Sequence, residues 1–297
     1  IFLCGFYLIL FFGIKTIFSF LGLILLLCSM FIIFSDILNT KVKKNILLII
    51  YFLLQISVIC IVFFSIYNNK INNVSPFKNT VASFDSQYGY IGVIDIQPDP
   101  KLIYNNKVIK TFRCLCNNGN IRNGIHSALY ITENSEIIQA APYIDMLFKI
   151  YDAKKDKKSI LFLGIGGNSL LNKILNSTQM LYSKNNKYDL VEIDPYMIKV
   201  AKEYFFFKET PNTTIHIKDA RLFINELVQN QQKNKYDIIF HDIYESNYLI
   251  PYETITVEAL EKIKYLLNDN GILAINVNSH ISGIKSNYLQ QICKQLN

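Results

Sequence analysis

The sequence predicts an α/β fold in which a parallel sheet carries helices on both faces. Three observations favour this architecture and the segments expected before it. From residue 159 onward, apolar strand patterns alternate five times with amphipathic helix patterns, which is typical of a parallel sheet. Short β-type runs broken by turns fill residues 80–120, and they indicate a small antiparallel β region. Residues 1–67 hold most of the apolar excess of a chain that is 51% hydrophobic, and they predict transmembrane helices.

Two apolar runs near the N-terminus, residues 16–35 and 46–67, are each about as long as the ~20 residues that cross a bilayer. We expect both to be transmembrane helices. Residues 1–14 resemble the end of an earlier span, since the chain begins inside an apolar run without Met. The lysines of the intervening loop favour a loop on the inner side. The chemistry inferred below needs a cytosolic metabolite, so we expect a multi-pass membrane protein whose C-terminal domain faces the cytoplasm.

Charge and cysteine usage exclude several classes of function. The net charge is +7, but the lysines are scattered among Asn and Ile and form no basic run with interleaved aromatics. We therefore expect no nucleic-acid partner. The six cysteines form no disulfide framework, which fits a reducing compartment. The four histidines lack metal-ligand spacing with each other or with Cys, so no metal is expected.

The elements of the two folded regions follow from their patterns. Residues 88–96, 101–106 and 107–116 predict strands of the antiparallel region, and residues 140–151 predict a helix. The parallel sheet should contain strands at 160–164, 188–194, 213–219, 236–242 and 271–277, with helices at 169–176, 196–206, 222–229, 257–267 and 287–296. Ligands of such sheets bind at the carboxyl ends of the strands, near the topological switch point.

The first strand of the parallel sheet ends in a glycine-rich turn that contains Gly164, Gly166 and Gly167. Glycines at this place allow a tight turn and a close approach of a ligand to the backbone. The third glycine of the dinucleotide-binding pattern is absent, and Ser169 stands there. A plain connection between strand and helix is the alternative interpretation.

Acidic residues follow the next three strands. Glu192 ends the second strand, where a carboxylate can accept hydrogen bonds from both hydroxyls of a ribose. Asp194 is interpreted as a helix cap, because Pro195 follows it. Asp219 and Asp242 end the third and fourth strands. For each acid alone an N-cap is the favoured interpretation, but acids at three successive strand ends after a glycine turn favour a ligand site.

This order of residues resembles the S-adenosylmethionine-dependent methyltransferase fold, a Rossmann-like sheet. In more detail it is similar to the spermidine synthase (polyamine aminopropyltransferase) family. The matching stretches are "ILFLGIGGNSLL", "YDLVEIDPYMIKVAKEYF", "IHIKDARLFI" and "YDIIFHDIYESNYLIPYETITVEALEKIKYLLNDNGILAINV". The resemblance covers about residues 83–280, and it is greatest to the branch in which a membrane region precedes the synthase domain.

The resemblance implies a role for each strand end. The donor would be decarboxylated S-adenosylmethionine or S-adenosylmethionine itself, used as a co-substrate without a metal. The implied donor-binding residues are Gly164, Gly166, Gly167, Glu192 for the ribose, and Asp219 with Ala220 for the adenine end. Asp242 would be the catalytic residue that accepts a proton from the attacking amine. The implied substrate-binding residues are Glu245, Tyr143 and Asp145.

Two departures from the family pattern put the substrate in question. The family carries an Asp inside the glycine turn, where this chain has Gly167. It also carries Tyr-His-Glu before the first strand, where this chain has Tyr143, Ile144 and Asp145. Both changes remove side chains that would contact the donor or the polyamine.

The leading hypothesis is a membrane-anchored aminopropyltransferase that acts on a small polyamine-type amine, with a homodimer as a further expectation. Two alternatives stay open: an S-adenosylmethionine-dependent methyltransferase, and a non-catalytic membrane-bound protein that binds a nucleoside or a polyamine. The expected domains are transmembrane helices at 1–70, the β region with its helix at 80–150, and a Rossmann-like nucleoside-binding catalytic domain at 151–297. Both ends of the chain are expected to be truncated.

Overall fold

The computed structural model describes residues 14–39, 53, 55–60, 79–98, 101–117, 125–139, 142–154, 159–176, 185–244, 249–279, 282–283 and 286–296. The chain divides into two compact units, Ile1–Ile91 and Gly92–Asn297. The boundary between them falls within strand β2 (Gly89–Ile96). The domain limits expected from the sequence stay a prediction.

The first unit contains helix α2 (Ile14–Asn39) and strand β1 (Thr80–Ser86). Within the described part of the chain, no helix combines the length and the apolar composition that crossing a membrane requires. The transmembrane helices expected from the sequence are therefore not supported by the structure. Most of the second apolar run, residues 46–67, lies outside the described residues. The cytoplasmic placement and the homodimer stay predictions.

An antiparallel sheet precedes the parallel one along the chain. Besides β2, its strands are β3 (Leu102–Tyr104), β4 (Lys107–Asn117), β5 (Ile125–Thr132) and β6 (Ile137–Gln139). The order is β1-β2-β4-β5-β6, and β3 pairs with β4. Asn105 and Asn106 join β3 to β4 with φ values of +50° and +59°, the left-handed conformation that two-residue hairpin turns require and that Asn adopts readily. Strands β5 and β6 were not among the predicted elements.

The parallel sheet confirms the predicted alternation of strands and helices. Its strands are β7 (Ser159–Leu163), β8 (Lys187–Glu192), β9 (Thr213–Ile217), β10 (Tyr236–His241) and β11 (Leu267–Ile275). Their order is β11-β10-β7-β8-β9, and all four pairings are parallel. The chain adds β8 and β9 on one side of β7, then returns to add β10 and β11 on the other. The topological switch point therefore lies between the carboxyl ends of β7 and β10.

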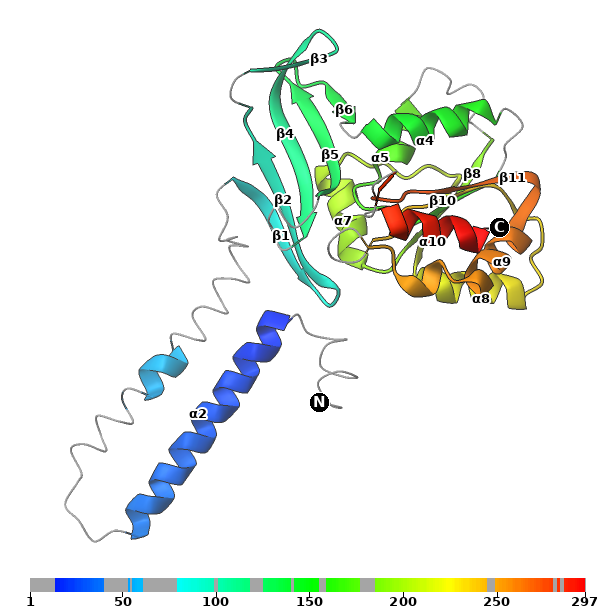
Figure 1. Cartoon of the computed structure of the whole chain (residues 1–297). Helices are drawn as coiled ribbons and strands as arrows, with labels where there is room; N and C mark the ends of the chain where they lie inside the picture. The colour runs from blue at the N-terminus through cyan, green and yellow to red at the C-terminus, as the bar shows by residue number, and fades with distance from the viewer. Residues whose placement is uncertain are drawn as a thin grey trace. The chain divides into compact units, whose positions relative to one another are not determined.

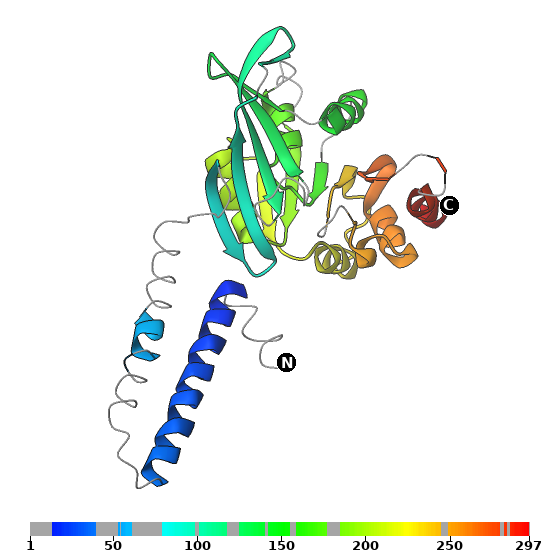
Figure 2. The same cartoon turned by 60° about the vertical axis from the view of Figure 1, so that its left-hand side comes forward.

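Helices cover both faces of this sheet (Figures 1 and 2). They are α4 (Pro142–Ala153), α5 (Ser169–Asn176), α7 (Pro195–Tyr204), α8 (Ala220–Gln229), α9 (Val257–Leu266) and α10 (Asn287–Leu296), with a short 3-10 helix, η4 (Tyr252–Thr254). Side chains alternate along a strand, so Ile160 and Phe162 of β7 pack in a cluster with α4 and α5. Leu161 and Leu163 pack in a second cluster with α8 and α9.

Candidate active site

The carboxyl ends of β7 and β10 meet at Gly164. Its φ is +78°, and a Cβ at this position would lie 2.4 Å from the backbone oxygen of Asp242. The Gly164 N–H donates to Val191 O at 2.9 Å, and the Asp242 N–H donates to Leu163 O at 2.8 Å. Only glycine fits between these strands. Because Gly164 has no side chain, Asp242 can come close to the glycine turn.

The rest of the glycine turn packs against the antiparallel sheet. Gly166 has a φ of +49°, and the Gly167 N–H donates to Ser127 Oγ of β5 at 2.7 Å. A Cβ at Gly167 would lie 2.8 Å from the Phe205 ring and from Ser127 Cβ. The Asp that the resembling family carries at this position would therefore not fit unless Phe205 and Ser127 moved.

Glu192 is buried at the end of β8, with 9% of its surface exposed. Its Oε2 accepts a hydrogen bond from the Ile165 N–H at 3.3 Å, and its Oε1 accepts one from the Asp194 N–H at 3.1 Å. Burial raises the pKa of this carboxyl, and the backbone hydrogen bonds oppose that rise. A carboxylate has about four lone-pair sites, so Glu192 can brace the glycine turn and still accept the hydroxyls of a ribose.

The remaining predicted donor-binding residues, Asp219 and Ala220, follow β9, and the predicted cap Asp194 follows β8. Asp219 is the N-cap of α8, and its Oδ1 accepts from the Leu222 N–H at 2.9 Å. Ala220 is the first residue of that helix and is buried. Asp194 caps α7 by accepting from the Tyr196 N–H at 2.9 Å, which confirms its interpretation as a cap. The ligand roles of Asp219 and Ala220 stay predictions, and Glu245 lies outside the described residues.

A small cavity lies beside the switch point, and we call it the switch-point cavity. It has room of about 20 Å³, and its walls are Ser127, Tyr143, Ile144, Leu147, Phe162, Gly164, Ile165, Asn168, Ser169, Leu170, Phe240 and Asp242. This volume accepts about one water-sized group. Asn168 Nδ2 and Ser169 Oγ are buried without a hydrogen-bond partner in the described part of the chain. Since buried polar atoms are normally paired, both are candidates for contact with a bound ligand.

Asp242 is the sole carboxylate among the described residues that line this cavity. Burial raises its pKa from an ordinary 3.8 to about 6, although a hydrogen bond from Asn276 Nδ2 to Oδ1, at 2.9 Å, opposes the rise. The charge of Asp242 in turn adds to the effect of burial in raising the pKa values of Tyr143 and Tyr244. A partly buried carboxylate that is paired with an amide, and with no cation among the described residues, is arranged to attract a cation.

Asn276 is a site residue that the sequence analysis missed. It follows β11 directly, and its N–H donates to His241 O at 2.9 Å. The Tyr244 hydroxyl donates to Asn276 O at 2.7 Å, so the backbone of Asn276 is held on both sides. The rule that polar residues at strand ends face the crevice would have found it, had the fifth strand been treated like the first four.

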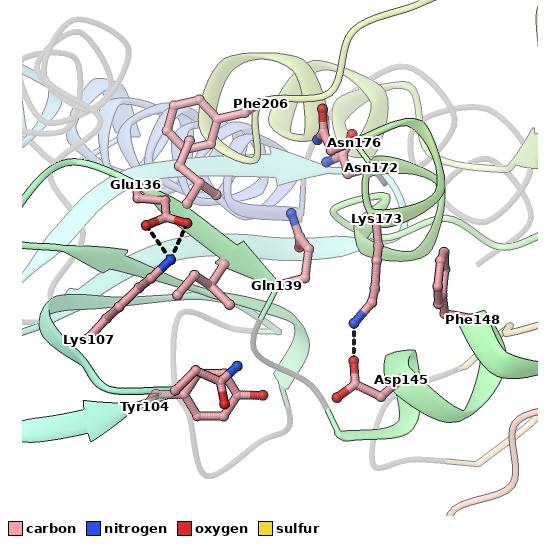
Figure 3. A pocket seen from close by; sticks show the side chains of 13 residues that line it. Tyr104, Lys107, Glu136, Gln139, Asp145, Phe148, Asn172, Lys173, Asn176 and Phe206 are labelled. Atoms are coloured by element: carbon pink, nitrogen blue, oxygen red, sulfur yellow. Dashed lines mark hydrogen bonds and ion pairs between the residues drawn. The ribbon is translucent and has the colours of Figure 1, made fainter. Parts of the chain in front are cut away.

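The structure separates Tyr143 from Asp145, which the sequence analysis grouped as substrate-binding residues. Tyr143 lines the switch-point cavity, whereas Asp145 lines a second cavity of about 500 Å³, which we call the hairpin cavity (Figure 3). The walls of the hairpin cavity are Tyr104, Asn105, Lys107, Glu136, Ile137, Ile138, Gln139, Asp145, Phe148, Asn172, Lys173, Asn176 and Phe206. Asp145 forms an ion pair there with Lys173.

No cluster of three or more His, Cys, Asp or Glu side chains suited to a metal ion occurs among the residues described above. The predicted independence from metal stays a prediction.

Comparison with known proteins identifies relatives of this chain. The model of the spermine/spermidine synthase domain family matches residues 143–297. The chain is 31% identical over 191 residues to the polyamine aminopropyltransferase of Vibrio vulnificus (strain CMCP6), which covers 63% of this chain and 60% of that protein. It is 39% identical over 93 residues to the N-terminal histidine N-methyltransferase of Emericella nidulans, which covers 31% of this chain and 16% of that protein.

A solved structure shares the fold. It is a spermidine synthase in complex with the transition-state analogue AdoDATO, at a TM-score of 0.51 and 16% identity, with 73% of this chain and 64% of that chain covered. At this identity the likeness shows the fold, and it supports the predicted α/β sheet of the S-adenosylmethionine-dependent methyltransferase type. The chain thus spans about 60% of the length of the curated aminopropyltransferase that it matches.

Proposed function

Because the chain belongs to the spermine/spermidine synthase domain family, a family of transferases, we propose that it transfers an aminopropyl group from decarboxylated S-adenosylmethionine to a small amine. The observation that carries this proposal is Asp242, a carboxylate at the switch point that has no cationic partner among the described residues and whose pKa is raised by burial to about 6. At pH 7 most of this group is ionised, so it can attract an ammonium and accept its proton.

The dimensions of the switch-point cavity support the same assignment. Its room of about 20 Å³ accepts one water-sized group, which fits an amine nitrogen and excludes a whole nucleoside. The nucleoside would lie along the strand ends outside it, where Glu192 can accept the ribose hydroxyls. The polar atoms Asn168 Nδ2 and Ser169 Oγ, which have no partner among the described residues, are available to orient groups that enter this cavity.

The transfer reaction needs few catalytic groups from the chain. A sulfonium donor supplies an activated carbon next to sulfur and leaves as a neutral thioether, so no oxyanion site is needed. Asp242 accepts the proton that frees the nitrogen lone pair, and it holds the amine toward the reacting carbon. Tyr143, on the first turn of α4, lines the same cavity as this carboxylate.

A methyltransferase is the second candidate function. It is favoured by the 39% identity to an N-methyltransferase over 93 residues, and its chemistry would use the same carboxylate with S-adenosylmethionine as the donor. The two functions differ in the group that is transferred and not in the part expected of Asp242.

The test is product formation by the full chain from 1,4-diaminobutane with each donor separately, followed by mass spectrometry. We expect an added aminopropyl group with the decarboxylated donor, and an added methyl group with S-adenosylmethionine would favour the second candidate. Asp242→Asn should lower the rate about 10²–10⁴-fold. Glu226→Gln, which changes a carboxylate in an exposed ion pair with Lys218, is the matched control. No product with either donor would refute both functions.

Binding of methylthioadenosine tests the donor half of the proposal without turnover. Glu192→Gln keeps the size of the side chain but weakens its acceptors, and it should reduce affinity by roughly 1–3 kcal/mol in calorimetry. Asp242→Asn should leave this affinity nearly unchanged. An unchanged dissociation constant for Glu192→Gln would remove the residue from the proposed nucleoside site.

A further inference from the structure

The hairpin cavity has the size and the wall chemistry of a ligand site that is separate from the switch-point cavity. Its volume of about 500 Å³ lies within the range of about 300–1,000 Å³ that small-molecule sites occupy. It is built between the β3–β4 hairpin and β6 on one side and α4 and α5 on the other (Figure 3). Nothing in the function proposed above uses it.

The two lysines that line this cavity already form ion pairs. Lys107 Nζ contacts both carboxylate oxygens of Glu136, at 2.6 and 2.7 Å. Lys173 Nζ pairs with Oδ1 of Asp145. Both lysines are thus neutralised by partners on their own walls, and an anionic ligand would have to displace a carboxylate to reach either of them.

Acceptors are among the polar groups that the walls offer to a ligand. Gln139 Oε1 is buried and has no hydrogen-bond partner within the described part of the chain. Lys173 bonds to Oδ1 of Asp145, so the second carboxylate oxygen of Asp145 can still accept. Asn172 donates one N–H of Nδ2 to Phe205 O at 2.8 Å, and its side-chain oxygen can accept.

The aromatic side chains of the cavity add to this preference. Tyr104, Phe148 and Phe206 line it, and the faces of aromatic rings attract cations. One such contact already exists, because the Lys173 ammonium lies 5.5 Å from the centre of the Phe148 ring while it pairs with Asp145. The wall therefore already holds one alkylammonium, that of Lys173, beside a carboxylate and an aromatic ring. A bound amine would need the same surroundings.

We propose that the hairpin cavity binds a small alkyl amine through Gln139, Asp145 and the aromatic walls, at a site distinct from that of Asp242. An amine is rich in donors and positively charged, so it satisfies the buried acceptor and the free carboxylate oxygen together. This proposal does not depend on turnover, and it would hold for a chain without transferase activity.

The chain contains no tryptophan, which allows a reporter that senses this cavity alone. Tyr104→Trp keeps an aromatic ring on the wall, and its fluorescence in the full chain can be followed while 1,4-diaminobutane is added. We expect a saturable change with 1,4-diaminobutane and none with 1,4-butanediol, a neutral molecule of equal length. An equal response to the diol, or no saturable response to the diamine, would overturn the proposal.

Further substitutions in the Tyr104→Trp background locate the amine. Gln139→Leu removes the unpaired acceptor at similar size, and it should weaken the amine about tenfold, the loss expected for one hydrogen bond of about 1.4 kcal/mol. If Gln139→Leu does not fold, as judged by circular dichroism, Asp145→Asn provides the same test. Asp242→Asn should leave the titration unchanged. Unaltered affinity in Gln139→Leu and Asp145→Asn, or loss of the signal in Asp242→Asn, would overturn the proposal and would leave the test of transferase activity unaffected.

Discussion

The switch-point cavity and the hairpin cavity adjoin opposite sides of the first turn of α4, and they treat their carboxylates differently. Asp242 is partly buried with an amide partner, and burial raises its pKa to about 6. Asp145 has a side chain that is 46% exposed and pairs with Lys173. A partly buried carboxylate without a cationic partner among the described residues attracts a cation strongly, whereas the charge of an exposed carboxylate that is already paired is partly compensated.

The two cavities also differ in volume and in how tightly their walls are packed. The switch-point cavity has room for about one water-sized group, and the hairpin cavity is about 500 Å³. The smaller one is bounded by Gly164, where an added Cβ would lie 2.4 Å from the backbone oxygen of Asp242. The larger one is bounded by flexible charged side chains. Substitutions should therefore have large effects on the first and small effects on the second.

The largest effect should follow from breaking the wall of the switch-point cavity. Gly164→Ala adds a Cβ 2.4 Å from the backbone oxygen of Asp242, at a φ of +78°. We expect the free energy of unfolding to fall by about 3–5 kcal/mol, from backbone strain and from the forced separation of β7 and β10. Urea denaturation followed by circular dichroism measures the loss.

Gly283→Ala is the matched control for this experiment. Gly283 has a similar φ of +81°, but a Cβ there meets no atom of the described residues within 4 Å. Its substitution should cost only the conformational strain, about 1–2 kcal/mol. Equal losses in the two variants would mean that the close approach of Asp242 to Gly164 contributes nothing to stability.

The second-largest effect is the dependence of stability on pH that arises from Asp242. The pKa of Asp242 in the folded chain, about 6, lies above its ordinary 3.8. The folded state therefore binds the proton more tightly, and stability is lost as pH rises through this window, by roughly 3 kcal/mol at neutral pH. Asp242→Asn should remove that loss, so the variant should be about 2–3 kcal/mol more stable than the wild type at pH 7.

The gain from Asp242→Asn should disappear below about pH 4, where the wild-type carboxyl is protonated in both states. Denaturation curves collected from pH 4 to pH 8 test this sign. A destabilised Asp242→Asn variant at pH 7 would mean that the charge of Asp242 is compensated in the folded chain.

The sequence could predict much of the parallel sheet because its signals are local. Helices α5 and α10 begin and end at the predicted residues, and the strand ends fall close to the predicted acids. β5 and β6 were missed for a physical reason. β6 has only three residues, Ile137–Gln139, and it is defined by pairing with Leu129–Ile131 of β5, a contact that no short window of sequence contains.

The separation of Tyr143 and Asp145 could have been foreseen. Residues two apart on a helix point about 200° away from each other, so they could not line one cavity from the same helix. The partners of Glu192 were less predictable, because its hydrogen bond to the Ile165 N–H joins residues 27 apart. The pairing of Gly167 with Ser127 joins two different sheets, and no spacing rule connects them.

The third-largest effect tests whether Asn276 lowers the pKa of Asp242. Asn276→Ala removes the donor that bonds to Asp242 Oδ1 at 2.9 Å, while the backbone bonds of residue 276 can persist. That hydrogen bond lowers the pKa of Asp242, so its loss should raise the pKa further. A bond to a charged group is worth about 1.5 kcal/mol or more, which corresponds to about one pH unit.

The pH dependence of stability measures this change without any substrate. In Asn276→Ala the fall in stability should extend to about one pH unit higher than in the wild type. In the double variant with Asp242→Asn, the effect of Asn276→Ala on the pH dependence should vanish, because Asp242 is no longer present to titrate. An unshifted midpoint in Asn276→Ala would show that Asn276 does not set the charge state of Asp242.

The smallest effect is expected at the ion pair of the hairpin cavity. The side chains of Lys173 and Asp145 are 30% and 46% exposed, so water screens their attraction and competes for both groups. A double-mutant cycle with Asp145→Asn and Lys173→Met should give a coupling energy below about 1 kcal/mol, and added salt should reduce it further. A coupling of several kcal/mol that ignores salt would indicate a buried pair like those of protein interiors. The contrast with Asp242 would then fail, because both cavities would hold carboxylates in equally dry surroundings.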